Sequence, residues 1–191
     1  MSARVLAACA AALLCTPSLG IAQGSARQPF TIDDLVRLKR ITDPRISPDG
    51  RHVAFVLRET DMDANKGRTD LWLLPLGGSD MPEPPRRLTQ HSANDSSPRW
   101  APDSRTLYFL SARSGTAQVW RLSLEGGEAT QVTDFPLEVG SLEVSPAGDR
   151  LAISMEVLAG CADLKCTKTK LEAEEKSAPT GRAYDRLFVR H

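Results

Sequence analysis

Hydrophobic and polar positions change their period early in the sequence. The segment Thr31-Ile-Asp-Asp34 places a threonine three residues before an acidic residue, which is typical of a helix start. Ile32, Leu35 and Val36 would share one face of a helix that runs to about Arg40, so we expect that face to pack against another element. Beyond it, short runs rich in β-branched and aromatic residues alternate with turns that contain Pro and Gly. This pattern predicts strands.

One phrase, a tight turn followed at once by an apolar run, occurs three times. Its Pro, Asp and Gly supply the backbone angles of a turn, and β-forming residues follow. The turns are Ser47-Pro-Asp-Gly50, Ala101-Pro-Asp-Ser104 and Ser145-Pro-Ala-Gly148. A second phrase with a tryptophan and paired glycines occurs twice, at 70–78 and 118–127. The whole unit therefore repeats, and Thr89 and Thr133 lie 44 residues apart in it.

A repeat of this length with four short β segments is typical of the blades of a β-propeller. We predict an all-β chain that forms an incomplete β-propeller of about two and a half four-stranded blades, preceded by one short N-terminal helix. The partial propeller is expected at 31–191, with blades at about 41–90, 91–134 and 135–191. An insertion at about 155–183 interrupts the third blade. It is predicted to hold a helical turn at 171–176 before a last strand at 186–190.

The first copy of the unit is longer than the second. Phe55 and Phe109 lie 54 residues apart, whereas Trp72 and Trp120 lie 48 apart. The first copy therefore carries six extra residues before Trp72, and the spacing of 44 at the threonines adds four more. Both extra segments fall in polar stretches, at 60–69 and 79–86, and we interpret them as loops.

The N-terminus has the pattern of a secretory signal peptide. Arg4 precedes an apolar run at 5–14, and small residues lead up to Ala22. We predict a signal peptide at 1–22, with cleavage after Ala22 or, as second choice, Ala26, and a flexible lead at 23–30. The protein is then exported to the periplasm or the extracellular space. The apolar run is too short to span a bilayer, so no stable membrane insertion is expected.

Export changes the cysteine count. Cys9 and Cys15 leave with the signal peptide, and Cys161 and Cys166 remain. An even number of cysteines in an oxidising compartment predicts a disulfide between Cys161 and Cys166. The three histidines are remote in sequence from this pair: His52, His91 and His191. No metal site is therefore predicted.

Composition and motifs exclude several classes of function. Lys and Arg number 24 and Asp and Glu number 24, so nothing indicates nucleic acid or an anionic membrane as partner. The chain has no Gly-x-Ser-x-Gly motif, and Ser114 lies in a turn with no base near it in sequence. We predict no catalytic residue and no cofactor site.

The remaining polar and aromatic candidates have structural explanations. Asp49 and Asp103 occupy equivalent turn positions and are expected to form Asx turns rather than to bind a metal. His52 and His91 are expected to be solvated or locally hydrogen-bonded. The tryptophans are expected in the core between blades: Trp72, Trp100 and Trp120.

The segment Asp34-Leu-Val-Arg-Leu-Lys-Arg-Ile-Thr-Asp-Pro-Arg-Ile-Ser-Pro-Asp-Gly50, together with the blade phrases, the insert at 161–166 and the segment 184–191, resembles the propeller of the prolyl oligopeptidase family of serine peptidases. It is most similar to the exported bacterial dipeptidyl-aminopeptidase and acylaminoacyl-peptidase branch. There the propeller precedes a C-terminal α/β-hydrolase domain and limits which oligopeptides reach its Ser, Asp and His triad. The resemblance implies a substrate-gating domain with that hydrolase domain and peptide substrates as partners, and no catalysis by this chain alone.

Two alternatives stay open. The blade phrase also resembles Tol-type periplasmic propellers, which would make the chain a protein-binding module. Propellers close with about 4 to 8 blades, so two and a half blades leave faces that need neighbours. We therefore expect either the N-terminal portion of a longer protein or a truncated reading frame without function. A Gly-x-Ser-x-Gly motif encoded downstream would favour the peptidase.

Overall fold

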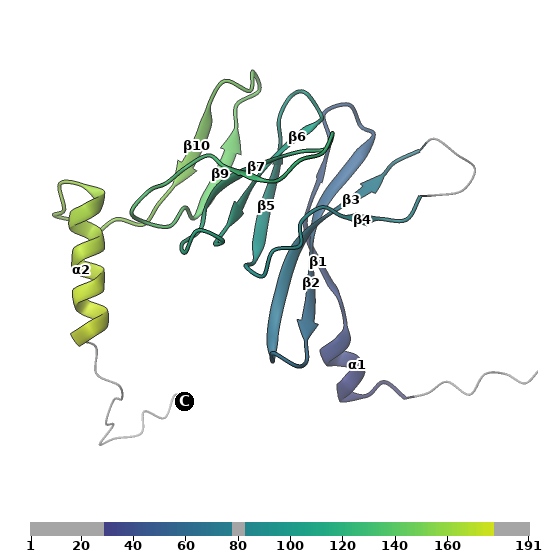
Figure 1. The fold of residues 1–191 in the computed structure, drawn as a ribbon, viewed down its shortest axis with the longest axis horizontal. Helices are drawn as coiled ribbons and strands as arrows, with labels where there is room; N and C mark the ends of the chain where they lie inside the picture. Colours follow the sequence, from purple (N-terminus) through teal and green to yellow (C-terminus); the bar gives the residue numbers. More distant parts are fainter. Residues whose placement is uncertain (1–28, 78–82, 178–191) are drawn as a thin grey trace, which may run out of the picture. The chain divides into compact units, whose positions relative to one another are not determined.

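The computed structural model describes residues 29–77 and 83–177 (Figure 1). The elements below all belong to one compact unit, which begins at Ile32. The predicted signal peptide, most of the lead and the predicted strand at 186–190 lie outside the described residues. The elements, in chain order, are α1 (Ile32–Arg37), β1 (Arg40–Ile46), β2 (His52–Asp61), β3 (Lys66–Pro75), β4 (Arg86–Arg87), β5 (Asp95–Trp100), β6 (Thr106–Ser111), β7 (Gln118–Ser123), β8 (Thr130–Gln131), β9 (Ser141–Val144), β10 (Leu151–Ser154) and α2 (Leu164–Ser177).

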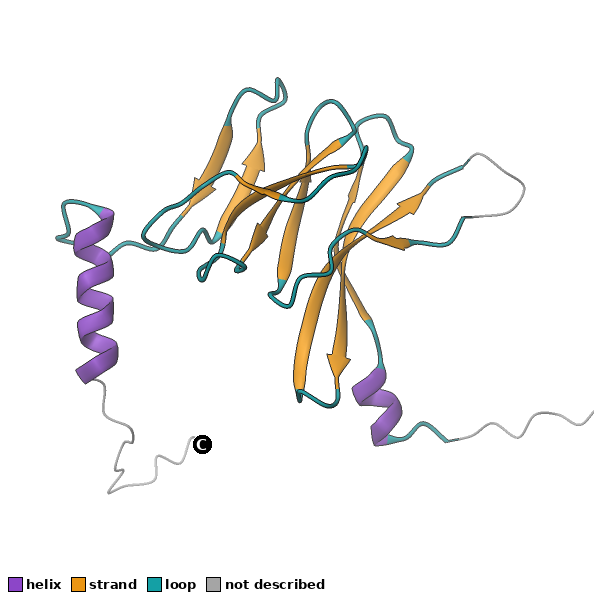
Figure 2. Cartoon of the chain, viewed as in Figure 1, coloured by secondary structure: helices purple, strands orange, loops and turns teal. Residues whose placement is uncertain are grey.

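The strands form two four-stranded antiparallel sheets and one two-stranded sheet (Figure 2). Their orders are β1-β2-β3-β4, β5-β6-β7-β8 and β10-β9. The register repeats as well, because Phe55 lies opposite Trp72 in the first sheet and Phe109 lies opposite Trp120 in the second. The predicted four-stranded units and the all-β fold class are therefore confirmed.

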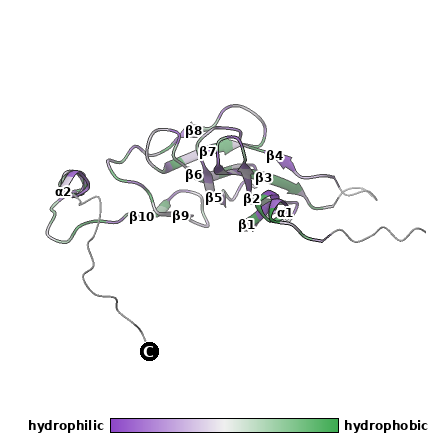
Figure 3. Ribbon diagram, turned by 90° about the horizontal axis from the view of Figure 1, so that it is seen from below, coloured by the Kyte–Doolittle hydropathy of each residue, from purple (hydrophilic) through white to green (hydrophobic). Residues whose placement is uncertain are grey.

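The hydrophobic core lies between successive sheets. Val56 and Leu71 of the first sheet form one buried cluster with Phe109 and Leu122 of the second. A further cluster joins the second sheet to β9: Leu110, Val119, Val139 and Leu142. The apolar second half of β3 contrasts in hydropathy with basic β4 in the same sheet (Figure 3). Each sheet thus buries one face against the next, as propeller blades do.

The repeated turn has the same geometry in all three copies. Its fourth residue donates a backbone hydrogen bond to the carbonyl of the first and has a positive φ, which is 70° at Gly50, 57° at Ser104 and 74° at Gly148. The Asp49 carboxylate accepts from the backbone N–H of Arg51 at 3.1 Å. The Asp103 carboxylate accepts from the backbone N–H groups of two residues that follow it. The predicted Asx turns are confirmed.

The first helix differs from the prediction in length and in packing. It ends at Arg37 rather than near Arg40, because Arg40 already begins β1 and lies opposite Arg58. The apolar face does not pack against the sheet as expected. Ile32 is 80% exposed and Leu35 is 52% exposed.

The six-residue extension of the first copy is not a loop, so that interpretation was wrong. β2 and β3 pair without interruption out to Asp61 opposite Lys66, and only 62–65 form the turn. The extra residues lengthen β2 and β3 by the same number of residues, so the pairing register of the two strands continues unchanged through the extension. The side chains of this extension are mostly polar. The second extra segment, at 79–86, lies partly outside the described residues.

A second helix replaces the predicted helical turn at 171–176. α2 has 14 residues and begins inside the insertion, directly after Asp163. The Asp163 carboxylate accepts the backbone N–H of Cys166 at 2.7 Å, which satisfies one of the free donors of the first turn. The N-terminal helix of the predicted fold class is confirmed, and the insertion holds a full second helix instead of a single turn.

Candidate functional site

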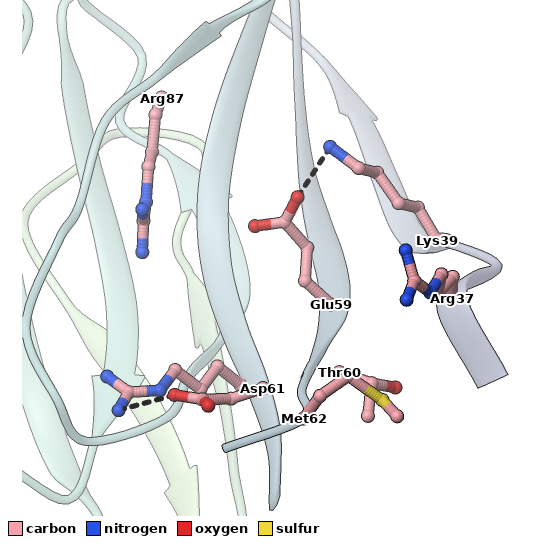
Figure 4. A pocket seen from close by; sticks show the side chains of 8 residues that line it. Arg37, Lys39, Glu59, Thr60, Asp61, Met62 and Arg87 are labelled. Atoms are coloured by element: carbon pink, nitrogen blue, oxygen red, sulfur yellow. Dashed lines mark ion pairs between the residues drawn. The ribbon is translucent and has the colours of Figure 1, made fainter. Parts of the chain in front are cut away.

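A pocket of about 670 Å³ opens where α1 meets the far end of the β2–β3 hairpin (Figure 4). Its lining comes from α1, β2, β3 and β4, from the turn between β2 and β3, and from the segment between α1 and β1. The residues are Arg37, Lys39, Glu59, Thr60, Asp61, Met62, Arg68 and Arg87. Arg37 is the last residue of α1, and Lys39 directly precedes β1. Arg87 comes from β4 and lies across Glu59 from these two in the view of Figure 4.

The hairpin extension supplies most of the lining of this pocket. Five lining residues belong to the segment by which the first sheet exceeds the second: Glu59, Thr60, Asp61, Met62 and Arg68. In the second sheet β6 and β7 end their pairing at Ser111 opposite Gln118, so nothing corresponds to this wall. The six extra residues therefore add a pocket wall to an architecture that the two sheets otherwise share.

Basic groups outnumber acidic groups in the lining. Lys39 Nζ lies 2.6 Å from Glu59 Oε1, and Arg68 Nη2 lies 2.9 Å from Asp61 Oδ2. A hydrogen bond from the backbone N–H of Ala64 holds the pKa of Asp61 below its ordinary value. Burial acts in the opposite direction, and the charge of Arg68 adds to the lowering. With two of the four cations paired inside the pocket, the lining keeps a net positive charge.

The other two cations, Arg87 and Arg37, differ in whether they already have ion-pair partners. Arg87 is directed to the buried carboxylate of Asp70 and donates from Nε to the Thr89 carbonyl at 2.8 Å. Burial outweighs Arg87 and raises the pKa of Asp70. Among the described residues, Arg37 makes no ion pair. It is the one lining cation that has no ion pair with a described carboxylate.

A chain of charges joins the first strands of three sheets. Arg45 Nε donates to Asp43 at 2.8 Å, and Arg99 Nη1 donates to the same carboxylate at 2.9 Å. Arg99 Nε also donates to Glu143 at 2.9 Å. Burial alone would lower the pKa of Arg99, but the hydrogen bonds to Asp43 and Glu143 outweigh it and raise the pKa. Arg99 therefore links β1, β5 and β9.

The predicted disulfide residues lie in the insertion, away from the pocket lining. The structure bonds Cys161 to Cys166 with their Cα atoms 5.5 Å apart, and Cys166 lies in the first turn of α2. The oxidation of this pair in solution stays a prediction. In the described ranges, no group of three or more His, Cys, Asp or Glu side chains is placed so that it could hold a metal ion.

The other predicted candidates are scattered. His91 Nδ1 accepts the backbone N–H of Ala93 at 3.0 Å, as expected for a locally hydrogen-bonded histidine. His52 differs, because its Nδ1 atom is buried without a partner among the described residues. Trp100 donates from Nε1 to the Arg45 carbonyl at 2.8 Å and so bridges two sheets. Ser114 lines a separate hollow that contains no histidine.

Sequence reasoning missed every residue of the pocket. The polar extension was interpreted as a loop, and Arg37 lies at the end of a helix that was expected to matter only for its apolar face. The signal that could have found them is the coincidence of a length difference with Asp61, Met62 and Arg68 inside it. None of the helices in the described ranges is long and apolar enough to cross a membrane.

The chain is similar to a family of propeller domains and to individual proteins that contain them. The model of a family described as PD40, TolB beta propeller domain, matches residues 37–178. The chain is 32% identical over 160 residues to the uncharacterized peptidase YuxL of Bacillus subtilis, covering 82% of this chain and 23% of that protein. It is 42% identical over 53 residues to the Tol-Pal system protein TolB of Bordetella pertussis, which covers 28% of this chain and 11% of that protein.

A solved structure agrees with the sequence comparison. An acylaminoacyl peptidase in complex with Z-Gly-Gly-Phe-chloromethyl ketone matches with a TM-score of 0.50 and 25% identity, over 62% of this chain and 18% of that one. The resemblance to the propeller portion of prolyl-oligopeptidase-type peptidases is confirmed. The chain spans less than a quarter of the length of the peptidase relatives.

Proposed function

Because the chain belongs to the PD40 family of TolB beta propeller domains, we propose that it is the N-terminal propeller portion of an exported serine peptidase that acts on oligopeptides. The propeller limits which peptides reach a C-terminal α/β-hydrolase domain. This chain supplies no catalytic residue of its own, and the hydrolase domain is its partner.

One observation carries this proposal over its rival. The similarity to a named peptidase extends over 82% of the chain, from the first sheet into the insertion, whereas the TolB match covers 28%. A shared blade phrase alone explains a short match. A match over most of the chain requires that the sheets, their connections and the insertion correspond together.

The two-sided construction of the sheets supports a gating role. One side of each sheet is buried against the next, and the first strands β1, β5 and β9 are linked through Arg99. In a closed propeller these strands surround a central channel. A channel lined by rigid strands admits short peptides to the hydrolase domain and excludes larger chains by their size.

A length series of peptides tests the proposal. The protein to use is the product of the coding sequence read on past the codon for His191, called the extended protein below. We expect kcat/KM to be high for tripeptides and hexapeptides and to fall by at least about tenfold for peptides of roughly 40 residues, since only short chains pass the channel. Absence of hydrolysis contradicts the peptidase assignment, and equal kcat/KM at all lengths contradicts gating.

A Tol-like role predicts a different result. A protein-binding module would hydrolyse nothing at any length and would instead co-purify with a defined protein partner. The same preparation therefore separates the two candidates.

A further inference from the structure

We propose that the pocket between α1 and the β2–β3 hairpin is a subsite that binds a peptide carboxylate, with Arg37 as its principal cation. This inference rests on the proposed function and adds the chemistry of the substrate. The carboxylate is either the C-terminus of the peptide or the side chain of an Asp or Glu residue in it.

The charge balance of the lining is the first argument. Arg37, Lys39, Arg68 and Arg87 face two carboxylates of the lining, Glu59 and Asp61. Arg87 also contacts the Asp70 carboxylate outside the lining. The four cations therefore exceed these three carboxylates by one charge. A single carboxylate ligand supplies the missing negative charge.

The second argument is the kind of cation that is left over. A guanidinium presents paired N–H donors that match the two oxygens of a carboxylate. Arg37 has no ion-pair partner among the described residues, and it is exposed, so binding a ligand breaks no existing pair. Lys39 and Arg68 have side chains 61% and 45% exposed, and each can share its charge with a second acceptor.

The third argument is that the lining near the cations includes groups suited to a peptide. Met62 is half exposed at the hairpin turn, and its flexible thioether can contact side chains of different shapes. Thr60 beside it adds a hydroxyl group. Cations for the carboxylate and an adaptable apolar contact for the adjoining residue therefore lie in one hollow.

The fourth argument is that the wall is present only in the first sheet. The two sheets share their register at Phe55–Trp72 and Phe109–Trp120, so the core does not need the extra residues. The extension buries no hydrophobic core residue beyond Leu57. A segment that the fold does not require, and that positions five of the eight lining residues, is explained by what the pocket binds.

Equilibrium binding of labelled hexapeptides to the extended protein tests this proposal. Four probes carry an N-terminal fluorophore on a Gly and Ala backbone: a free acid, its C-terminal amide, the amide with one central Glu, and the same amide with Gln. A small serine-directed inhibitor is added first so that probes are not cleaved. Hydrolysis before that addition reports the proposed function separately, so loss of binding and loss of catalysis are distinguished.

We expect a Kd about tenfold lower for the free acid than for the amide, or for the Glu probe than for the Gln probe, according to the source of the carboxylate. Arg37→Gln abolishes the difference, and Arg37→Lys keeps part of it. Arg40→Gln is the matched control, because Arg40 is an exposed arginine three residues away that does not line the pocket. The difference also shrinks between about 0.05 M and about 0.5 M salt, because the pocket is open to solvent.

The outcomes are decisive in both directions. Equal affinities within both probe pairs overturn the proposal. So does a preference for the carboxylate that Arg37→Gln leaves intact or that Arg40→Gln removes equally. Arg68→Gln provides a second variant in the lining, and it is expected to weaken binding of the preferred carboxylate probe without abolishing the preference.

Discussion

The side-chain oxygen of Ser104 accepts a hydrogen bond from the backbone N–H of Asp49 at 3.0 Å. The two residues occupy neighbouring positions of the same repeated turn, one in the first sheet and one in the second. The third turn continues the row, since a Cβ atom on Gly148 would lie 2.9 Å from Cδ of Pro102 in the second. Three copies of one sequence phrase therefore contact each other directly and align successive sheets.

This row predicts unequal effects of one substitution at two equivalent positions. Gly50 and Gly148 have φ values of 70° and 74°, but only Gly148 would place a Cβ atom against another turn. We expect Gly50→Ala to lower the free energy of unfolding by about 1 kcal/mol through backbone strain. Gly148→Ala should cost about 1–3 kcal/mol more because of overpacking. Urea unfolding of the extended protein measures both, and equal costs would show that the turns do not pack together.

Arg99 should stabilise the assembly of sheets far more than an ordinary surface arginine. Its side chain is 14% exposed and donates to carboxylates in two other sheets. Arg99→Met removes charged hydrogen bonds to Asp43 and Glu143 and is expected to cost about 2 kcal/mol. Arg105→Met is the control, since the Arg105–Glu125 pair is 71% and 68% exposed and should contribute about 0–1 kcal/mol. Similar unfolding midpoints for the two variants would contradict the linking role.

Asp103 gives the protein a defined response to acid. Burial tends to raise its pKa, but hydrogen bonds from Arg105 and Thr106 outweigh burial and lower the pKa below 3.8. A carboxyl group with a lowered folded-state pKa adds stability above its unfolded value, and that stability is lost as pH falls through the folded value. Asp103→Asn keeps an acceptor for the turn and removes the titration. Wild-type protein should therefore lose more stability than this variant as the pH falls below 3.8, and parallel curves would count against the account.

The disulfide should determine whether α2 forms. α2 is mostly hydrophilic (Figure 3), Thr167 is its only buried residue, and 14 residues are marginal for a helix in water without packing. The Cys161–Cys166 bond and the Asp163 cap both act on its first turn. Reduction should raise amide hydrogen exchange across 164–177 while β2 and β3 stay protected. Unchanged protection of α2 after complete reduction would show that other contacts hold it.

The predictable parts of the fold are those that the repeat encodes. Phe55 with Trp72 and Phe109 with Trp120 recur in the same phrase, and the turns carry Pro and Gly at fixed positions, so strands and sheets could be read from the sequence. At such positions the local sequence alone indicates a strand or a turn. The recurrence of the same residues in a second copy supports that prediction.

The hairpin extension, α2 and the pocket could not be predicted in this way. Glu59 to Asp61 pair with Arg68 to Lys66 through backbone hydrogen bonds, which polar side chains do not reveal. α2 lacks a buried apolar stripe, so periodicity predicts only a turn. The pocket brings α1, β2, β3 and β4 together, and Arg37 and Arg87 lie 50 residues apart in the chain. Such a site exists only in the folded protein.

Labelling of the extended protein with a fluorophosphonate probe tests the central claim most directly. If the chain is the propeller portion of a serine peptidase, one serine encoded beyond residue 191 is labelled, and oligopeptide hydrolysis is lost in proportion to the labelling. Mass spectrometry of the labelled peptide gives its position. A preparation that binds no probe and hydrolyses no oligopeptide, or a label on a serine within residues 1–191, contradicts the account.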